Sequence, residues 1–110
     1  NVMQSTRGSM LMALSDGGLQ YFLAGARANC GMKSGRYAFE ARIIEALSLA
    51  EEPGSKGKTP QPRCHVRIGL ATSSSSLFLG ETEESICFDT SGCLVHKGQR
   101  TKLGKGFGLH

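Results

Sequence analysis

The chain has little of several residue types that mark common protein classes. It contains no tryptophan, three prolines and 6% aromatic residues among its 110 residues. No run approaches the roughly 18 consecutive apolar residues of a membrane-spanning helix, and no signal peptide is recognisable. Because the chain begins at Asn1, we expect it to be an excised piece of a longer protein, whose targeting signals could lie elsewhere.

Glycine, by contrast, is abundant, with 15 residues. A content of 39% hydrophobic and 20% charged residues is typical of a folded chain, and the length allows one domain at most. Many glycines with few prolines indicate tight turns between short strands, as an all-β chain requires.

The four cysteines are too widely and irregularly spaced for a paired zinc motif. They are Cys30, Cys64, Cys87 and Cys93. Three of them lie in segments predicted to be strands or strand starts. We therefore expect buried free thiols in an intracellular protein, and no metal.

Positive charge gathers near the end of the chain. The formal net charge is +4, and no acidic residue follows Asp89. The stretch HKGQRTKLGKG carries Lys97, Arg100, Lys102 and Lys105. Such a cluster could contact phosphates or an acidic partner, and the alternative is a solvated basic loop.

No group of residues has the spacing of a catalytic or nucleotide-binding site. The stretch GSKGKT resembles a phosphate-binding loop, but Glu52 occupies the position where that loop needs its first glycine. Cys64 and His65 would point to opposite faces of a strand, so they cannot act together as nucleophile and base. We therefore expect neither enzyme activity nor a cofactor.

Alternating patterns predict short strands in the second half of the chain. In residues 64–71, CHVRIGLA, apolar positions alternate with smaller or polar ones. Residues 73–76 are all serine and predict a turn, and residues 85–98 predict two strands around a turn at Ser91 and Gly92. Short strands separated by glycine turns favour a β-sandwich.

The stretch GRYAFEARIIEAL fits two structures. Phe39, Ile43 and Leu47 recur every four residues, which slightly favours a helix. The same stretch also alternates as a strand would, with Tyr37 and Phe39 on one side. The strands predicted around it favour a strand over residues 36–46.

Two arginines stand among small or apolar residues. Arg27 lies in AGARA and Arg67 in HVRIGLA. Each could be structural, with its stem on the sheet and its guanidinium on loop carbonyls. Each could instead present the guanidinium to a carboxylate or phosphate of a partner. The residues alone leave both alternatives open.

Three stretches in order resemble a SPRY domain: YFLAGARANCGMKSGRYAFEARI, HVRIGLATSSSSLFLGETEES and KLGKGFG. Together they run from about residue 19 to residue 108. The resemblance is closest to the type found in heterogeneous nuclear ribonucleoprotein U and its relatives. The SPRY module of the absent-small-or-homeotic-discs subunit of histone methyltransferase complexes comes second.

This resemblance implies an all-β fold, a bent antiparallel β-sandwich of the concanavalin or jelly-roll kind. It makes residues 36–46 an inner strand with Phe39 and Tyr37 facing the core. Residues 1–18 would be an N-terminal extension or first strand. Residues 19–110 would be the N-terminal and central part of the domain, with a long surface loop at 48–63. The final strands of the sandwich would be missing, which favours swapping or oligomerisation.

The resemblance also implies a non-enzymatic protein–protein interaction module of a nuclear, RNA-associated or chromatin-associated protein. Arg27 and Arg67 would then line a basic groove that binds a short acidic peptide. The partner would be a protein or peptide, with RNA bound through the parent protein. The alternative is direct binding of a nucleic-acid backbone through the basic stretch 96–105.

Overall fold

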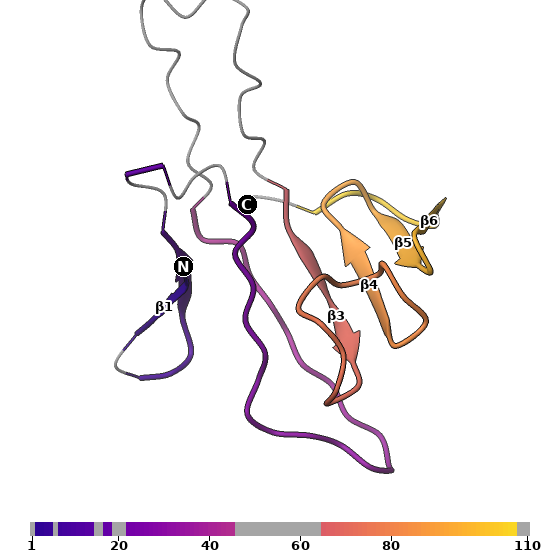
Figure 1. The fold of residues 1–110 in the computed structure, drawn as a ribbon, viewed down its shortest axis with the longest axis horizontal. Helices are drawn as coiled ribbons and strands as arrows, with labels where there is room; N and C mark the ends of the chain where they lie inside the picture. The colour runs from indigo at the N-terminus through magenta and orange to yellow at the C-terminus, as the bar shows by residue number, and fades with distance from the viewer. Residues whose placement is uncertain (1, 6, 15–16, 19–21, 46–64, 108–110) are drawn as a thin grey trace, which may run out of the picture.

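The chain forms two antiparallel β-sheets and no helix in the part that the structure describes (Figure 1). The computed structural model describes residues 2–5, 7–14, 17–18, 22–45 and 65–107. Within these ranges no helix is long and apolar enough to cross a membrane. The prediction of an all-β antiparallel fold is confirmed. The surface loop predicted at 48–63 lies outside the described residues.

The smaller sheet is a hairpin near the N-terminus. Strand β1 (Val2–Gln4) pairs with β2 (Leu11–Ala13), so that Met3 lies opposite Met12. The Ser5 amide donates a hydrogen bond to the Met10 carbonyl at 2.9 Å, which continues the pairing beyond the strands. These two strands occupy the region predicted to be an extension or a first strand.

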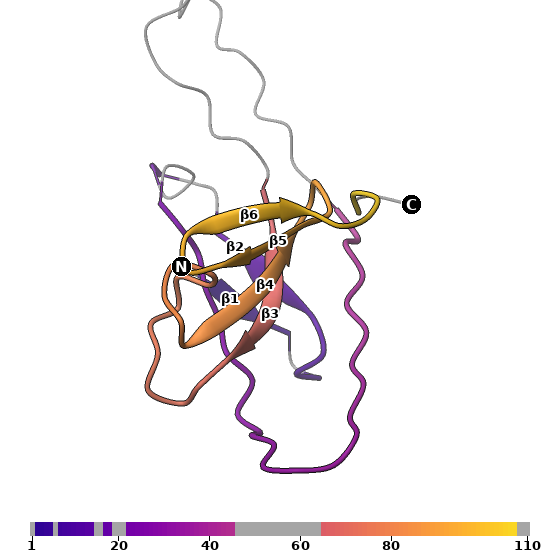
Figure 2. The same ribbon diagram turned by 90° about the vertical axis from the view of Figure 1, so that its right-hand side faces the viewer.

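The larger sheet has four strands in the order β3-β4-β5-β6 (Figure 2). They are β3 (Arg67–Ala71), β4 (Ser85–Asp89), β5 (Cys93–His96) and β6 (Gln99–Lys102). Each strand is antiparallel to the next along the chain, so the sheet is a simple meander. The strands predicted within 64–71 and on both sides of Ser91 and Gly92 are confirmed.

Strand β6 was not predicted, because the sequence pattern of its residues indicated only a basic stretch. It pairs with β5 through a two-residue turn at Lys97 and Gly98, with His96 opposite Gln99. Both turn residues have positive φ, 54° and 74°. Two successive residues with positive φ suit the tight turns that join twisted antiparallel strands. Gly98, at the second turn position, was the feature of the sequence that could have predicted this turn and the strand after it.

Alternation along the strands gives the larger sheet two different faces. The inner face carries the buried side chains Ser85, Cys87, Asp89 and Val95. The outer face carries the apolar side chains Ile68, Leu70, Ile86, Phe88 and Leu94. The apolar side chains thus gather on the face opposite the buried one.

Residues 72–84, the covering loop, close the inner face. The Gly80 amide donates a hydrogen bond to Ser85 Oγ at 2.8 Å, and the Gly80 carbonyl accepts one from the Gly98 amide at 2.8 Å. Gly80 has a φ of +85°, and a Cβ at this position would lie 2.7 Å from Val95 Cγ1. Only glycine permits both this backbone conformation and this close approach.

The strand predicted over residues 36–46 is not formed in its described part, 36–45, and neither is the alternative helix. Tyr37 and Phe39, predicted to face the core, are 66% and 61% exposed. The prediction was wrong because a strand needs a neighbouring backbone to pair with, and none of the described strands pairs with this segment. Residues 22–28 likewise form no strand (Figure 1).

Candidate interaction surface

Arg27 is tied to the covering loop. Its Nη1 donates a hydrogen bond to the Ser73 carbonyl at 2.9 Å, and its Nη2 donates one to the Ser75 carbonyl at 2.5 Å. Nη2 also lies 3.2 Å from Ser75 Oγ and 3.5 Å from the Ser76 carbonyl. One guanidinium therefore joins three carbonyls within residues 73–76 to a segment about 46 residues earlier in the chain.

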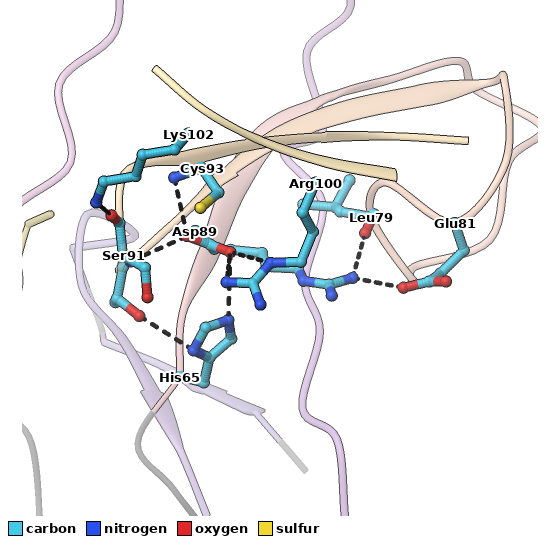
Figure 3. Close-up of polar contacts among 10 residues, drawn as sticks. His65, Leu79, Glu81, Asp89, Ser91, Cys93, Arg100 and Lys102 are labelled. Atoms are coloured by element: carbon cyan, nitrogen blue, oxygen red, sulfur yellow. Dashed lines mark hydrogen bonds and ion pairs between the residues drawn. The ribbon is translucent and has the colours of Figure 1, made fainter. Parts of the chain in front are cut away.

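Arg67 binds the same loop further along. Its Nη1 donates hydrogen bonds to the Leu79 carbonyl at 2.8 Å and to Glu81 Oε1 at 2.6 Å (Figure 3). Arg67 is the first residue of β3, so the loop that leaves the far end of this strand returns to its beginning. The ion pair with Glu81 is partly exposed, which weakens its contribution through solvent screening.

The structure thus brings both predicted arginines to one loop, from two different segments. Their hydrogen bonds to carbonyls are those expected of structural arginines. An acidic peptide that bound Arg67 would have to compete with Glu81, which already lies against the guanidinium. The two arginines therefore fix the conformation of the loop, and the outward side of the loop is the surface open to a partner.

The outward side of the covering loop is both apolar and acidic. Leu77 and Phe78 are 51% and 56% exposed. Glu81, Glu83 and Glu84 follow within six residues and are also exposed. Large apolar side chains on a loop that is fixed by hydrogen bonds favour contact with another molecule.

Asp89 is the polar centre of the inner face. Its side chain is fully buried and accepts hydrogen bonds from the Ser91 and Cys93 amides at 2.9 and 3.1 Å. Arg100 donates two more, from Nε at 3.0 Å and from Nη2 at 2.6 Å (Figure 3). Burial raises the pKa of Asp89, but the hydrogen bonds from Cys93, Arg100 and Ser91 outweigh it and hold the pKa below its ordinary value.

His65 lies at the edge of this centre. Its Nε2 is 3.8 Å from Asp89 Oδ2, and its Nδ1 is 3.2 Å from Thr90 Oγ1. Asp89 organises the turn after β4 by accepting from two turn amides, as aspartates before turns often do. The sequence Asp-Thr-Ser-Gly was a signal for this role, but the residue was not predicted to be part of any site.

The predicted basic cluster divides into two pairs. Arg100 is bound to Asp89, and Lys102 Nζ donates a hydrogen bond to the Ser91 carbonyl. Lys97, in the β5–β6 turn, and Lys105 form no hydrogen bond or ion pair with any residue that the structure describes. Two of the four positive charges therefore bind groups at the inner face of the sheet, and the other two remain available to a partner.

A cleft of about 850 Å³ lies against the outer face of the sheet. One wall is the unpaired segment 39–43, and the other is formed by β3, β4 and β5 with Phe107. Leu70, Ile86 and Phe88 on the outer face are 51%, 39% and 47% exposed. The missing final strands that the resemblance implies would leave an apolar face uncovered, but the sequence did not indicate which residues would form it.

The cysteines have different environments. Cys87 is buried, as predicted, and burial raises the pKa of its thiol. Cys30 is exposed, so the prediction of burial was wrong for this residue, which lies outside the strands. Cys93 is half-buried, and Cys64 lies outside the described residues. Within the described ranges no three His, Cys, Asp or Glu side chains gather as a metal site would require.

Comparison with known proteins gives relatives of low identity. The chain is similar to heterogeneous nuclear ribonucleoprotein U-like protein 2. It is 33% identical over 85 residues to both the mouse and the human protein, which is 77% of this chain. It spans about a tenth of the length of these relatives. No family model matches the chain. No solved structure matches the chain.

Proposed function

We propose that this chain is a non-enzymatic protein-interaction module of the SPRY type, from a nuclear protein associated with RNA or chromatin. The ordered motifs along the chain and its all-β antiparallel fold support this assignment. The name of the similar proteins associates them with nuclear ribonucleoproteins. The covering loop is the binding surface.

The observation that carries the proposal is the way in which the covering loop is held. Arg27 and Arg67 reach it from separate segments and bind its backbone along most of its length. A loop held in one conformation loses less conformational entropy when it binds, so more of the contact energy appears as affinity. Leu77 and Phe78 are the exposed apolar side chains that this fixed loop displays.

The loop also indicates the chemistry of the partner. Apolar contacts would come from Leu77 and Phe78, and ion pairs from Glu83 and Glu84, which are exposed. Such a surface suits a peptide with apolar and basic residues. This partner differs from the acidic peptide that the resemblance implied, because Arg27 and Arg67 already bind the loop.

The test is a fluorescence-anisotropy titration of the chain into two labelled peptides, one rich in leucine and lysine and one rich in glutamate and aspartate. We expect the first to bind more tightly. Phe78→Ser should weaken it about tenfold or more, since exposed anchors of this size contribute 1–2 kcal/mol or more. Leu103→Ser, which changes another exposed apolar residue, is the matched control and should have no effect.

Arg27→Ala should also weaken this peptide, because it frees the loop, while Arg27→Lys should do so less. Tighter binding of the acidic peptide, abolished by Arg27→Ala, would instead restore the groove predicted from the sequence. Binding of neither peptide would contradict the proposal.

A second candidate is contact with a nucleic-acid backbone. Lys97 and Lys105 are the observation in its favour, because no described residue neutralises them. With two such side chains, affinity for an RNA oligomer should be weak and fall steeply with added salt. Lys97→Ala with Lys105→Ala should flatten the salt dependence, and Lys33→Ala, an exposed lysine outside the basic stretch, should not.

A further inference from the structure

Residues 37–45 have the pattern of a strand but pair with none of the strands that the structure describes. Among the described residues, none forms a backbone hydrogen bond with this segment. Tyr37, Phe39 and Ile44 are 66%, 61% and 64% exposed. Aromatic and β-branched residues favour strands, and an extended segment with free amides and carbonyls can pair with the edge of another chain.

The charges of this segment are complementary to those of a second, antiparallel copy of the same segment. Glu40 and Arg42 lie on the same side of an extended chain and form no ion pair with a described residue. If two copies pair antiparallel with Ala41 opposite Ala41, each Glu40 lies opposite the partner's Arg42. The same register places each Phe39 opposite the partner's Ile43.

Neighbouring registers lose this complementarity. If Glu40 lies at the two-fold axis, the two Glu40 carboxylates face each other and repel. If Arg42 lies at the axis, the two guanidinium groups face each other and repel. A shift by one residue places the apolar row of one chain beside the charged row of the other. The register centred on Ala41 therefore satisfies both rows at once.

We propose that two copies of this chain associate through antiparallel pairing of residues 37–45, with the two-fold axis at Ala41. The contact is isologous, so the Glu40–Arg42 pair forms twice by symmetry. Phe39 and Ile43 line the cleft against the outer face of the sheet, so the pairing joins the apolar walls of two clefts. The proposal is independent of the function assigned to the covering loop.

The first test is charge exchange, followed by analytical ultracentrifugation of the 110-residue chain over a range of concentrations. The unsubstituted chain should associate to dimers. Glu40→Arg alone and Arg42→Glu alone should each weaken association roughly tenfold or more, because two attractive pairs become repulsive. Glu40→Arg combined with Arg42→Glu should restore it.

Restoration by the double exchange separates pairing from a fault in folding, since both side chains are exposed and the net charge is unchanged. A chain that stays monomeric at all concentrations overturns the proposal. So does a dimer whose association ignores the single charge changes, or one that the double exchange does not restore.

The second test fixes the register by cross-linking. Ala41→Cys should form a disulfide between the two copies under mild oxidation, identified by mass spectrometry as a peptide that joins residue 41 to residue 41. Ala38→Cys is the matched control. In the proposed register its two copies lie about 20 Å apart along the strands, too far for a disulfide. Cross-linking at 38 but not at 41 would overturn the register.

Discussion

The two faces of the four-stranded sheet reverse part of the usual arrangement, because polar side chains are buried on the inner face and apolar side chains are exposed on the outer face. The inner face holds buried polar groups, Asp89 and Ser85, each hydrogen-bonded beneath or beside the covering loop. The outer face holds Leu70, Ile86 and Phe88, which are apolar and well exposed. Antiparallel sheets commonly bury the apolar face and leave the polar one in water.

The difference shows which contacts hold the sheet together. Hydrogen bonds and close packing act on the inner face, where Cys87 and Val95 are each 1% exposed. On the outer face, apolar area remains for contacts with other surfaces. Substitutions on the two faces should therefore have separable effects, on stability for one and on association or binding for the other.

The largest effect should come from Gly80→Ala. The new methyl group would lie 2.7 Å from Val95 Cγ1. The backbone at residue 80 would also have to keep a φ of +85°, which alanine tolerates poorly. We expect a loss of about 3 kcal/mol in the free energy of unfolding, from strain and overpacking together. Urea denaturation followed by circular dichroism measures it.

Gly98→Ala is the matched control. Gly98 has a φ of +74° but only one atom, the Glu81 carbonyl oxygen, within 4 Å of the added methyl group. It should cost only the backbone strain, about 1 kcal/mol. Equal losses in the free energy of unfolding for the two variants would show that the covering loop is not closely packed against the inner face.

A smaller effect should follow acidification, through Asp89. Because its pKa is lowered in the folded chain, its contribution to stability is complete above the unfolded value of about 3.9. That contribution is lost as the pH falls through the lowered pKa. Asp89→Asn should therefore be less stable than the unsubstituted chain at pH 7, and the gap should narrow below about pH 4. A gap that stays constant with pH would contradict the role of the carboxylate.

The smallest effect should come from the outer face. Phe88→Thr keeps strand propensity and removes a side chain that is 47% exposed, so the cost should be at most about 1 kcal/mol. Val95→Thr, on the inner face, should cost about 2 kcal/mol because it buries a hydroxyl group. Phe88→Thr should also reduce binding of an apolar dye, and Val95→Thr should not. Reversed costs would mean that the outer face is the true core.

Much of the larger sheet could be predicted, because its strands carry their own alternation and lie next to their partners along the chain. Strands β3, β4 and β5 were found in this way. The segment 36–46 could not be assigned in the same way, since a strand there depends on a distant partner rather than on its own residues. The resemblance to SPRY domains placed Phe39 in the core, while the structure places it on the wall of an open cleft.

The candidate site was predictable in its residues more than in their contacts. Arg27 and Arg67 stood out as cations among small or apolar residues, and both proved to have specific partners. Their common target is a loop, which no local pattern could reveal. Arg100 and Lys102 looked like free charges because Asp89 and the Ser91 carbonyl approach them only when β4, β5 and β6 are paired.

The burial of Cys87 has a kinetic consequence. Its sulfur lies 3.0 Å from the position that a Cβ of residue 80 would occupy, so the covering loop shields it from reagents. Burial also raises the pKa of this thiol, which slows its reaction further. The rate at which a thiol reagent modifies Cys87 in the native chain therefore measures how often the covering loop lifts from the sheet.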